Sequence, residues 1–306
     1  MKKKIEISEL YSLSAKSYQN ISPLDIREEI VSIKELPSLP STFSRIIKLA
    51  SDPDIDIEKV VEIIEQDPLL TAQVIKNARS SLYGYRGEVG TIHDAIVQVL
   101  GLNYVVNLVM GLSVLRPLKT PIDGKIGLRM FWIHALASVR LMTKLKKKLE
   151  HSQYINSQDI IFCSLIHNIG LPLLGHQFMD AGMQLERIIT ANPLIPINKI
   201  ETFTLGTDHT QLGEWLMRAW LMPKQIVTVV RHHHNPFYRG EYFELNLLTY
   251  ITDYLLGKIG IGDAENEEFY SGIWGVLGLK PESGYEALES IKQEVNSITA
   301  MANELM

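Results

Sequence analysis

Histidines are the residues in this chain whose type and spacing could do chemistry. A lone histidine on an apolar stripe usually satisfies its hydrogen bonds within a core. Here several recur on apolar segments of the second half of the sequence, and an aspartate follows on a later apolar segment. Neutral imidazole and carboxylate are the ligands that first-row divalent metal ions take, so the pattern predicts a metal centre. The residues concerned are His134, His167, His209, His232, His233, His234 and Asp253.

We expect helices, and not strands, to bring these residues together, because no segment shows sustained alternation of apolar and polar residues with turn signals. The sequence therefore predicts an all-α fold in which helices aim the histidines inward from several directions. The helices expected in the second half cover residues 128–149, 157–167, 171–191, 198–205, 208–220, 224–233 and 243–258, followed by an amphipathic one from 283 to the end.

Shorter helices with clear caps are expected in the first half. A first helix is predicted over residues 25–34, before Pro37 and Pro40. Asp67-Pro68 ends one helix and opens the next, since proline suits a first helical position. Thr91 is expected to cap the helix that follows a glycine-punctuated loop.

The segment 116–127, RPLKTPIDGKIG, is the best candidate for a boundary, because prolines and glycines interrupt two long helical patterns there. We therefore expect two lobes, with the histidines in the second. The predicted organisation is a flexible arm over 1–24, an N-terminal lobe over 25–117, a histidine-bearing lobe over 118–260 and a C-terminal helical extension over 261–306.

Composition excludes several functions. The chain of 306 residues is 46% apolar and 21% charged, which is ordinary globular usage. Its formal charge of -5 gives no global attraction to nucleic acid or to an anionic membrane, and we expect neither nucleic-acid binding nor membrane insertion. Cys163 is the only cysteine and lies in an apolar run, so we expect a small buried hydrophobe and a reducing, cytoplasmic location.

Four segments in order carry a resemblance to a known family. The histidines run as H, then HN, then DH, then HHHNP, then D, which resembles the HD superfamily of metal-dependent phosphohydrolases. The match is closer to the HDOD family, the HD-related output domain of bacterial signalling proteins, and it covers about residues 28–255. The segments are LPSLPSTFSRIIKLASDPDIDIEKVVEIIEQDPLLTAQVIKNARSSLYG, GTIHDAIVQVLGLNYVVNLVM, FWIHALASVRL and GTDHTQLGEWLMRAWLMPKQIVTVVRHHHNP.

The resemblance implies a two-lobed, multi-helix HD-like fold and a role for each site residue. His134 matches the first metal ligand of the HD pattern, His167 the second and Asp253 the last. The histidines at 209, 233 and 234 match the additional ligands of the branch that opens cyclic dinucleotides, and they are His209, His233 and His234.

Two positions depart from the catalytic pattern. Asn168 stands where the family has an aspartate that anchors metal, and Leu171 stands where a lysine often meets substrate phosphate. An amide is neutral and binds through one oxygen only. Because an anionic ligand in a low-dielectric site contributes on the order of several kcal/mol, we expect hydrolysis to be severely reduced.

The expected function is a regulatory output module that binds a partner signalling protein or a small phosphorylated ligand. Its histidines either retain a divalent ion or hydrogen-bond within the core as relics of an ancestral site. Zinc, iron and manganese are the candidates, and imidazole-rich sites favour the first two. One alternative is a metal-dependent phosphohydrolase acting on a nucleotide or cyclic dinucleotide. Another is an iron or oxygen sensor that uses the same residues without turnover.

Overall fold

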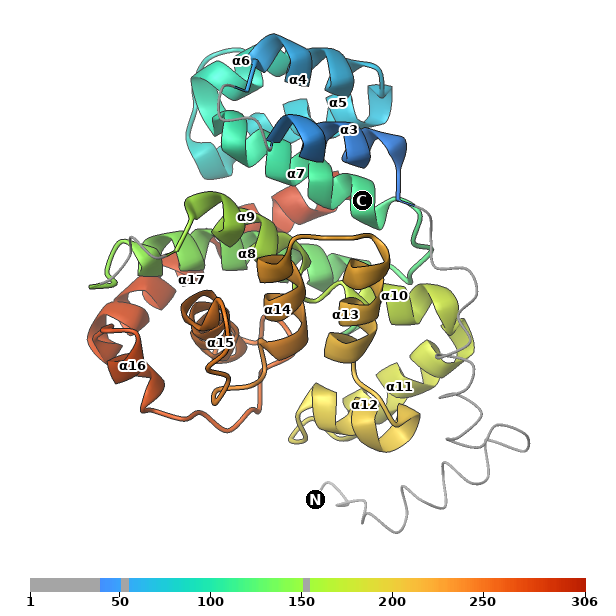
Figure 1. The fold of residues 1–306 in the computed structure, drawn as a ribbon, viewed down its shortest axis with the longest axis vertical. Helices are drawn as coiled ribbons and strands as arrows, with labels where there is room; N and C mark the ends of the chain where they lie inside the picture. Colours follow the sequence, from blue (N-terminus) through green and yellow to red (C-terminus); the bar gives the residue numbers. More distant parts are fainter. Residues whose placement is uncertain (1–38, 51–54, 151–154) are drawn as a thin grey trace.

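The computed structural model describes residues 39–50, 55–150 and 155–306, and within these ranges its regular secondary structure is entirely helical. This confirms the predicted all-α class. The helix expected over 25–34 and the arm expected over 1–24 lie outside the described residues. Figure 1 shows two groups of helices, with the earlier helices at one end and the later ones around α8 and α15.

Helices of the first group begin at the caps that the sequence predicts. The Asp67 side chain accepts from the backbone of Leu69 and Leu70, with Pro68 as the first residue of the helix. Thr91 and Asp94 cap each other's backbone N–H reciprocally. The elements are α3 (Ser41–Ala50), α4 (Ile57–Glu65), α5 (Pro68–Ala78), η1 (Ser81–Tyr83), α6 (Ile92–Asp94), η2 (Ala95–Leu100) and α7 (Leu102–Leu115).

The second group follows the predicted pattern with one correction. The single helix predicted over 171–191 is wrong, because Phe178 has φ -130° and ψ 59° and divides it. After this break the chain folds back so that Gly182 approaches Gly175. The elements are α8 (Leu128–Lys146), α9 (Ser157–Ile166), α10 (Gly170–Gln177), α11 (Met179–Ala191), α12 (Ile197–Leu205), α13 (His209–Ala219), α14 (Lys224–His232), α15 (Phe243–Gly257), α16 (Ile273–Val276) and α17 (Pro281–Leu305).

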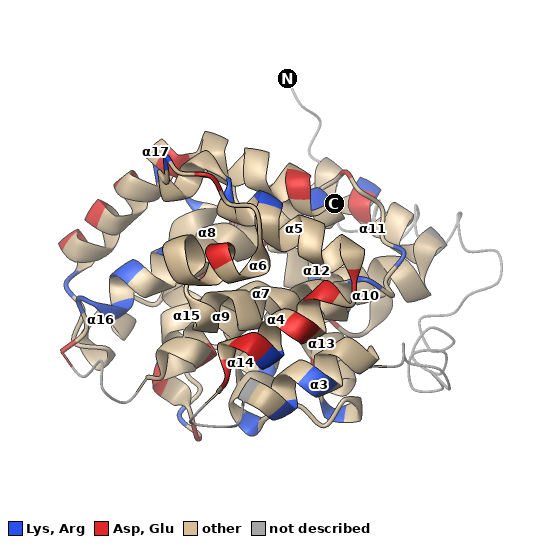
Figure 2. Ribbon diagram, turned by 90° about the horizontal axis from the view of Figure 1, so that it is seen from above, with Lys and Arg blue, Asp and Glu red and all other residues tan. Residues whose placement is uncertain are grey.

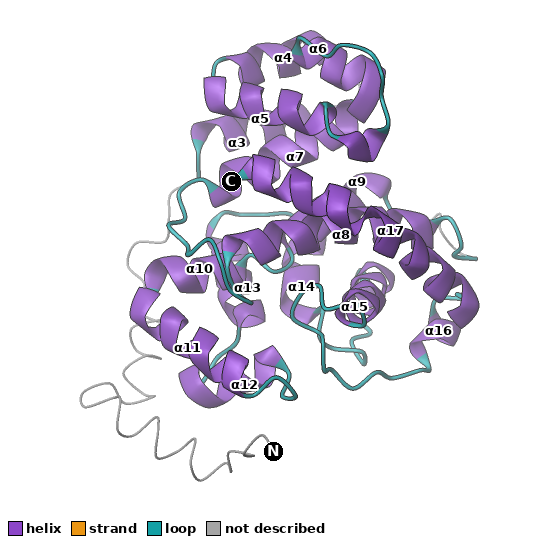
Figure 3. Ribbon diagram, turned by 180° about the vertical axis from the view of Figure 1, so that it is seen from behind, coloured by secondary structure: helices purple, strands orange, loops and turns teal. Residues whose placement is uncertain are grey.

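The last helix, α17, packs along α8 and reaches α5 at its end (Figure 3). Gln73 on α5 donates to the Leu305 carbonyl at 2.8 Å, and Lys76 lies 3.0 Å from the Glu304 carboxylate. Arg140 on α8 pairs with Glu294. The helix therefore contacts both groups of helices, and acidic residues outnumber basic ones along it (Figure 2).

The stretch 157–177, which comprises α9 and α10, is long and apolar enough to cross a membrane by length and composition. We did not predict such a stretch from the sequence. It is 83% buried inside the protein, as a core helix is. Cys163 lies within it as a buried free thiol, and burial raises the pKa of that thiol well above its usual range. His167, one of the site residues, lies within the same stretch at the end of α9.

Candidate metal centre

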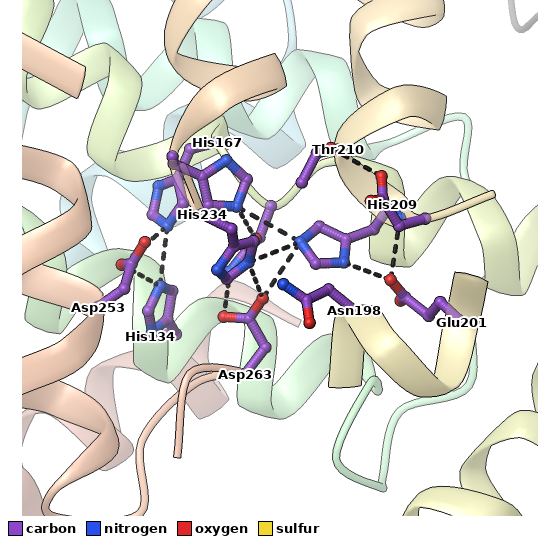
Figure 4. Close-up of polar contacts among 12 residues, drawn as sticks. His134, His167, Asn198, Glu201, His209, Thr210, His234, Asp253 and Asp263 are labelled. Atoms are coloured by element: carbon purple, nitrogen blue, oxygen red, sulfur yellow. Dashed lines mark hydrogen bonds and ion pairs between the residues drawn. The ribbon is translucent and has the colours of Figure 1, made fainter. Parts of the chain in front are cut away.

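Three predicted ligands meet in a first cluster, formed by His134 on α8, His167 at the end of α9 and Asp253 on α15 (Figure 4). The two imidazole Nε2 atoms lie 2.9 Å apart. Asp253 Oδ1 lies 3.2 Å from His134 Nε2 and 3.3 Å from His167 Nε2. All three side chains are at most 3% exposed, so three potential ligand atoms converge on one buried point.

A second cluster contains the other three predicted ligands. His209 Nε2, at the start of α13, lies 3.3 Å from His233 Nε2 and 3.1 Å from His234 Nε2. The two clusters adjoin, because the His167 and His233 ring centroids are 5.1 Å apart. The structure thus brings all six predicted ligands together, whereas His232 points elsewhere and stacks on Tyr238 with ring centroids 4.2 Å apart.

Four of these histidines are oriented by an oxygen at Nδ1, which directs Nε2 into the centre. His167 Nδ1 lies 3.0 Å from the Cys163 carbonyl, and His233 Nδ1 lies 3.0 Å from the Val230 carbonyl. A carbonyl can only accept, so each Nδ1 carries the proton and each Nε2 of the neutral ring offers a lone pair. Outer oxygens of this kind fix ligand histidines in metal sites.

Carboxylate oxygens orient the other two histidines, His209 and His234, in the same way. Glu201 Oε2 lies 2.7 Å from His209 Nδ1, and Glu267 Oε1 lies 2.8 Å from His234 Nδ1. Glu201 is fully buried on α12 (Figure 4). The sequence analysis missed both glutamates. A signal existed for Glu201, because it shares the buried helix face of Ile197 and Leu205 at four-residue spacing.

Asp263 is the ligand candidate that sequence reasoning missed entirely. It lies after α15, and its Oδ2 is 2.8 Å from His234 Nε2 and 3.2 Å from His209 Nε2 (Figure 4). Residues 261–264 are all buried. Gly262 passes so close to the first cluster that a Cβ there would lie 2.2 Å from His134 Nδ1. The loop that carries Asp263 therefore packs directly onto the histidines.

Asn168 lies between the second cluster and this loop. Its Oδ1 is 3.0 Å from His233 Nε2, and its Nδ2 donates to Asp263 Oδ1 at 3.0 Å. Gly170 makes this position reachable, because α10 begins against the backbone of α13 and a Cβ at Gly170 would lie 1.9 Å from the His209 carbonyl oxygen. The HNIG motif, residues 167–170, therefore contributes His167 as a potential ligand, Asn168 as an amide, and Gly170 as a close contact with the α13 backbone.

Burial and neighbouring charges shift the pKa values of the residues in the centre. Burial lowers the pKa of His209, but the charges of Glu201 and Asp263 and their hydrogen bonds outweigh it and raise that pKa to about 10. Burial likewise disfavours the charged form of Asp253, yet His167 and His134 hold the pKa of its carboxyl well below the usual range. Burial and the neighbouring His234 lower the pKa of His233. A cation must therefore displace protons to bind.

The donor set fits divalent transition-metal ions. Asp253 Oδ2 is buried without a hydrogen-bond partner among the described residues, a costly arrangement that a cation relieves, while Oδ1 faces the imidazoles of His134 and His167. Within each cluster the potential ligand atoms lie within 4.8 Å of one another. The first cluster offers two imidazoles and a carboxylate, and the second offers three imidazoles and a carboxylate. Such sets suit zinc, iron or manganese.

Comparison with known proteins identifies the class to which this fold and site belong. The profile of the HDOD domain matches residues 36–236, and the chain therefore belongs to the HDOD family. This confirms the resemblance carried by the sequence segments.

The chain is also similar to individual proteins in fold and sequence. A solved structure from Marinobacter aquaeolei VT8, described as a candidate signal-transduction protein, is 29% identical with a TM-score of 0.82 over 95% of this chain and 68% of that one. One from Shewanella amazonensis SB2B, described as a candidate phosphohydrolase, is 21% identical with a TM-score of 0.69 over 92% and 98%. An uncharacterized protein of Treponema pallidum (strain Nichols) is 26% identical over 203 residues, which are 66% of this chain and 38% of that protein.

Proposed function

We propose that this chain is a cytoplasmic regulatory output module of bacterial signalling that holds divalent metal in its histidine centre and acts by binding a partner protein, without efficient catalysis. One observation carries the proposal. The six predicted ligands converge in a buried centre, while the position that would anchor a catalytic metal pair holds Asn168, whose amide lies between His233 and Asp263.

Burial argues against phosphoester turnover at this centre. His234 is the most exposed ligand candidate, with 8% of its side chain accessible, so a phosphate has little access to the ions. Leu171, at the position of the family's lysine, is also buried and offers no cation. Asn168 brings no charge to its position, where a carboxylate would contribute on the order of several kcal/mol, and each 1.4 kcal/mol is about tenfold in rate. Metal retention with little hydrolysis follows.

A surface cavity of about 520 Å³ on the outer side of α13 and α14 is the place we propose for a small phosphorylated ligand. Arg218, Lys224 and Arg231 line it, and all three pair with glutamates that a phosphate would replace. Arg231 also donates to Thr210 Oγ1 at 2.7 Å, beside His209. A nucleotide or cyclic dinucleotide bound here would therefore act on the helices that carry the metal ligands.

A second candidate function is metal-dependent hydrolysis of a nucleotide or cyclic dinucleotide. The observation that favours it is the pair of adjoining ligand clusters, an arrangement that two-metal phosphohydrolases use. Bound ions would supply Lewis-acid activation of a phosphate. The residues of this chain would hold the ions, and Glu201 and Glu267 would orient two of the histidines.

One experiment separates the two functions. The purified chain is analysed for metal and then assayed on a generic phosphodiester and on cyclic dinucleotides, beside His167→Ala and Asn168→Asp. His93→Ala serves as the matched control, because His93 is half exposed and lies outside the centre. We expect bound metal, and turnover no greater than that of His167→Ala. Turnover that His167→Ala abolishes and His93→Ala preserves would overturn the regulatory proposal.

A further inference from the structure

We propose that Asp263 supplies the carboxylate ligand of the second cluster, in place of the carboxylate that position 168 lacks. The inference rests on the proposed metal binding and names the ligand set that achieves it. Asp263 comes from the loop after α15, beyond the helices whose pattern defines the other ligands. It would complete a site with His209, His233 and His234.

Both oxygens of Asp263 are committed within the centre. Oδ2 faces the Nε2 atoms of His234 and His209 at 2.8 and 3.2 Å, while Oδ1 accepts from the Asn168 amide at 3.0 Å. The side chain is 2% exposed. One oxygen is therefore placed to bind a cation beside two imidazoles, and the other is held by an amide donor that fixes the carboxylate plane.

The hydrogen-bond pattern around Asn168 is incomplete without a cation. His233 Nδ1 donates to backbone carbonyls, so its Nε2 is an acceptor, and it faces Asn168 Oδ1, another acceptor, at 3.0 Å. Turning the amide over would satisfy His233 but would set the amide oxygen against Asp263 Oδ1. Either orientation leaves two acceptors in contact, and a cation bound by the acceptor atoms removes the conflict.

If Asp263 supplies the ligand in place of position 168, reversing the amide and the carboxylate should restore metal binding. A purely structural role for Asp263 does not predict this. Asp263→Asn removes the carboxylate that accepts from the Asn168 amide, whereas Asn168→Asp sets two carboxylates about 3.0 Å apart. The double variant Asn168→Asp, Asp263→Asn restores one carboxylate and one amide with their positions reversed. Each single change should therefore damage the second centre, and the double change should restore it.

The test is a titration of the chelator-stripped protein with Co²⁺, with visible absorption as the readout and elemental analysis for stoichiometry. We expect two ions in the unmodified chain. Asp263→Asn should weaken the second ion by roughly 100-fold or more, above the 10–100-fold typical of losing an outer partner. The double exchange should recover binding to within roughly tenfold. Glu265→Gln is the control, because that carboxylate belongs to the same stretch but is exposed.

The outcomes distinguish the inference from the proposed function. Two ions bound by Asp263→Asn with unchanged affinity, or a double exchange no better than Asp263→Asn, would overturn the role of Asp263. A single ion in the unmodified chain, lost on Asp253→Asn, would overturn it too while leaving the metal-binding proposal intact. No Co²⁺ bound at all would overturn both. Asp263→Ser repeats the test if Asp263→Asn fails to fold by circular dichroism.

Discussion

Replacing Gly262 by alanine tests how tightly the Asp263 loop is packed onto the histidines. Gly262 has φ +91°, a backbone conformation that disfavours any residue with a Cβ. The added Cβ would lie 2.2 Å from His134 Nδ1 and must withdraw to a contact near 3.4 Å, so the loop or the ring must move by about 1.2 Å. Such a shift displaces either a first-cluster ligand or Asp263.

The expected loss has two parts. A Cβ in the left-handed region costs about 1–2 kcal/mol, and overpacking a tight site costs about 1–3 kcal/mol more. Gly260→Ala is the matched control, because Gly260 has φ +74° in the same loop but nothing within 4 Å of its Cβ position. Gly260→Ala should therefore lose only about 1–2 kcal/mol, the cost of a Cβ in the left-handed region.

Urea denaturation of the metal-free proteins gives the free energy of unfolding for each variant. We expect Gly262→Ala to be less stable than Gly260→Ala by about 1–3 kcal/mol. We also expect it alone to lose tight Co²⁺ binding. Equal free energies of unfolding, with equal Co²⁺ affinity, would refute the close packing of this loop on His134.

Three further predictions follow from the same contacts. Glu201→Gln should weaken metal binding by about 10–100-fold, because it removes the charge that orients His209, and a metal titration checks this. In the metal-free protein the raised pKa of His209 gives stability that is fully present below its ordinary value of 6.5 and is lost as pH rises through about 10, so the urea midpoint should fall over that window and fall less in Glu201→Gln. Gly170→Ala should destabilise the chain by about 2 kcal/mol or more in urea, because its Cβ would meet the His209 carbonyl oxygen at 1.9 Å, whereas Gly275→Ala, with open space around it, should not.

The helical positions of the site were predictable from sequence because they obey a period. His134 and Asp253 lie on two long helices that are buried over most of their length, and Asp67-Pro68 and Thr91 mark helix ends by local capping chemistry. Such signals need only neighbours in the chain. The all-α class followed from them, whereas the set of six candidate ligands came from the resemblance to the HD pattern.

The parts that were missed depend on contacts distant in sequence. Asp263 stands among glycines and acidic residues, a context typical of a solvated turn, and only packing against His134 and His209 makes it part of the site. The break at Phe178 likewise reflects α11 folding back on α10, which the apolar periodicity of both segments conceals. Side-chain type pointed to metal chemistry, while tertiary packing decided that Asp263 lies among the histidines.

The most direct test of the account is the metal content of the purified chain, measured together with its thermal midpoint before and after chelation. We predict zinc, iron or manganese bound at one to two ions per chain, a midpoint that falls on chelation and recovery when the ion is returned. His167→Ala should lose the ion of the first cluster. Protein without bound metal, whose midpoint is unchanged by chelation and by added ions, would contradict the central claim.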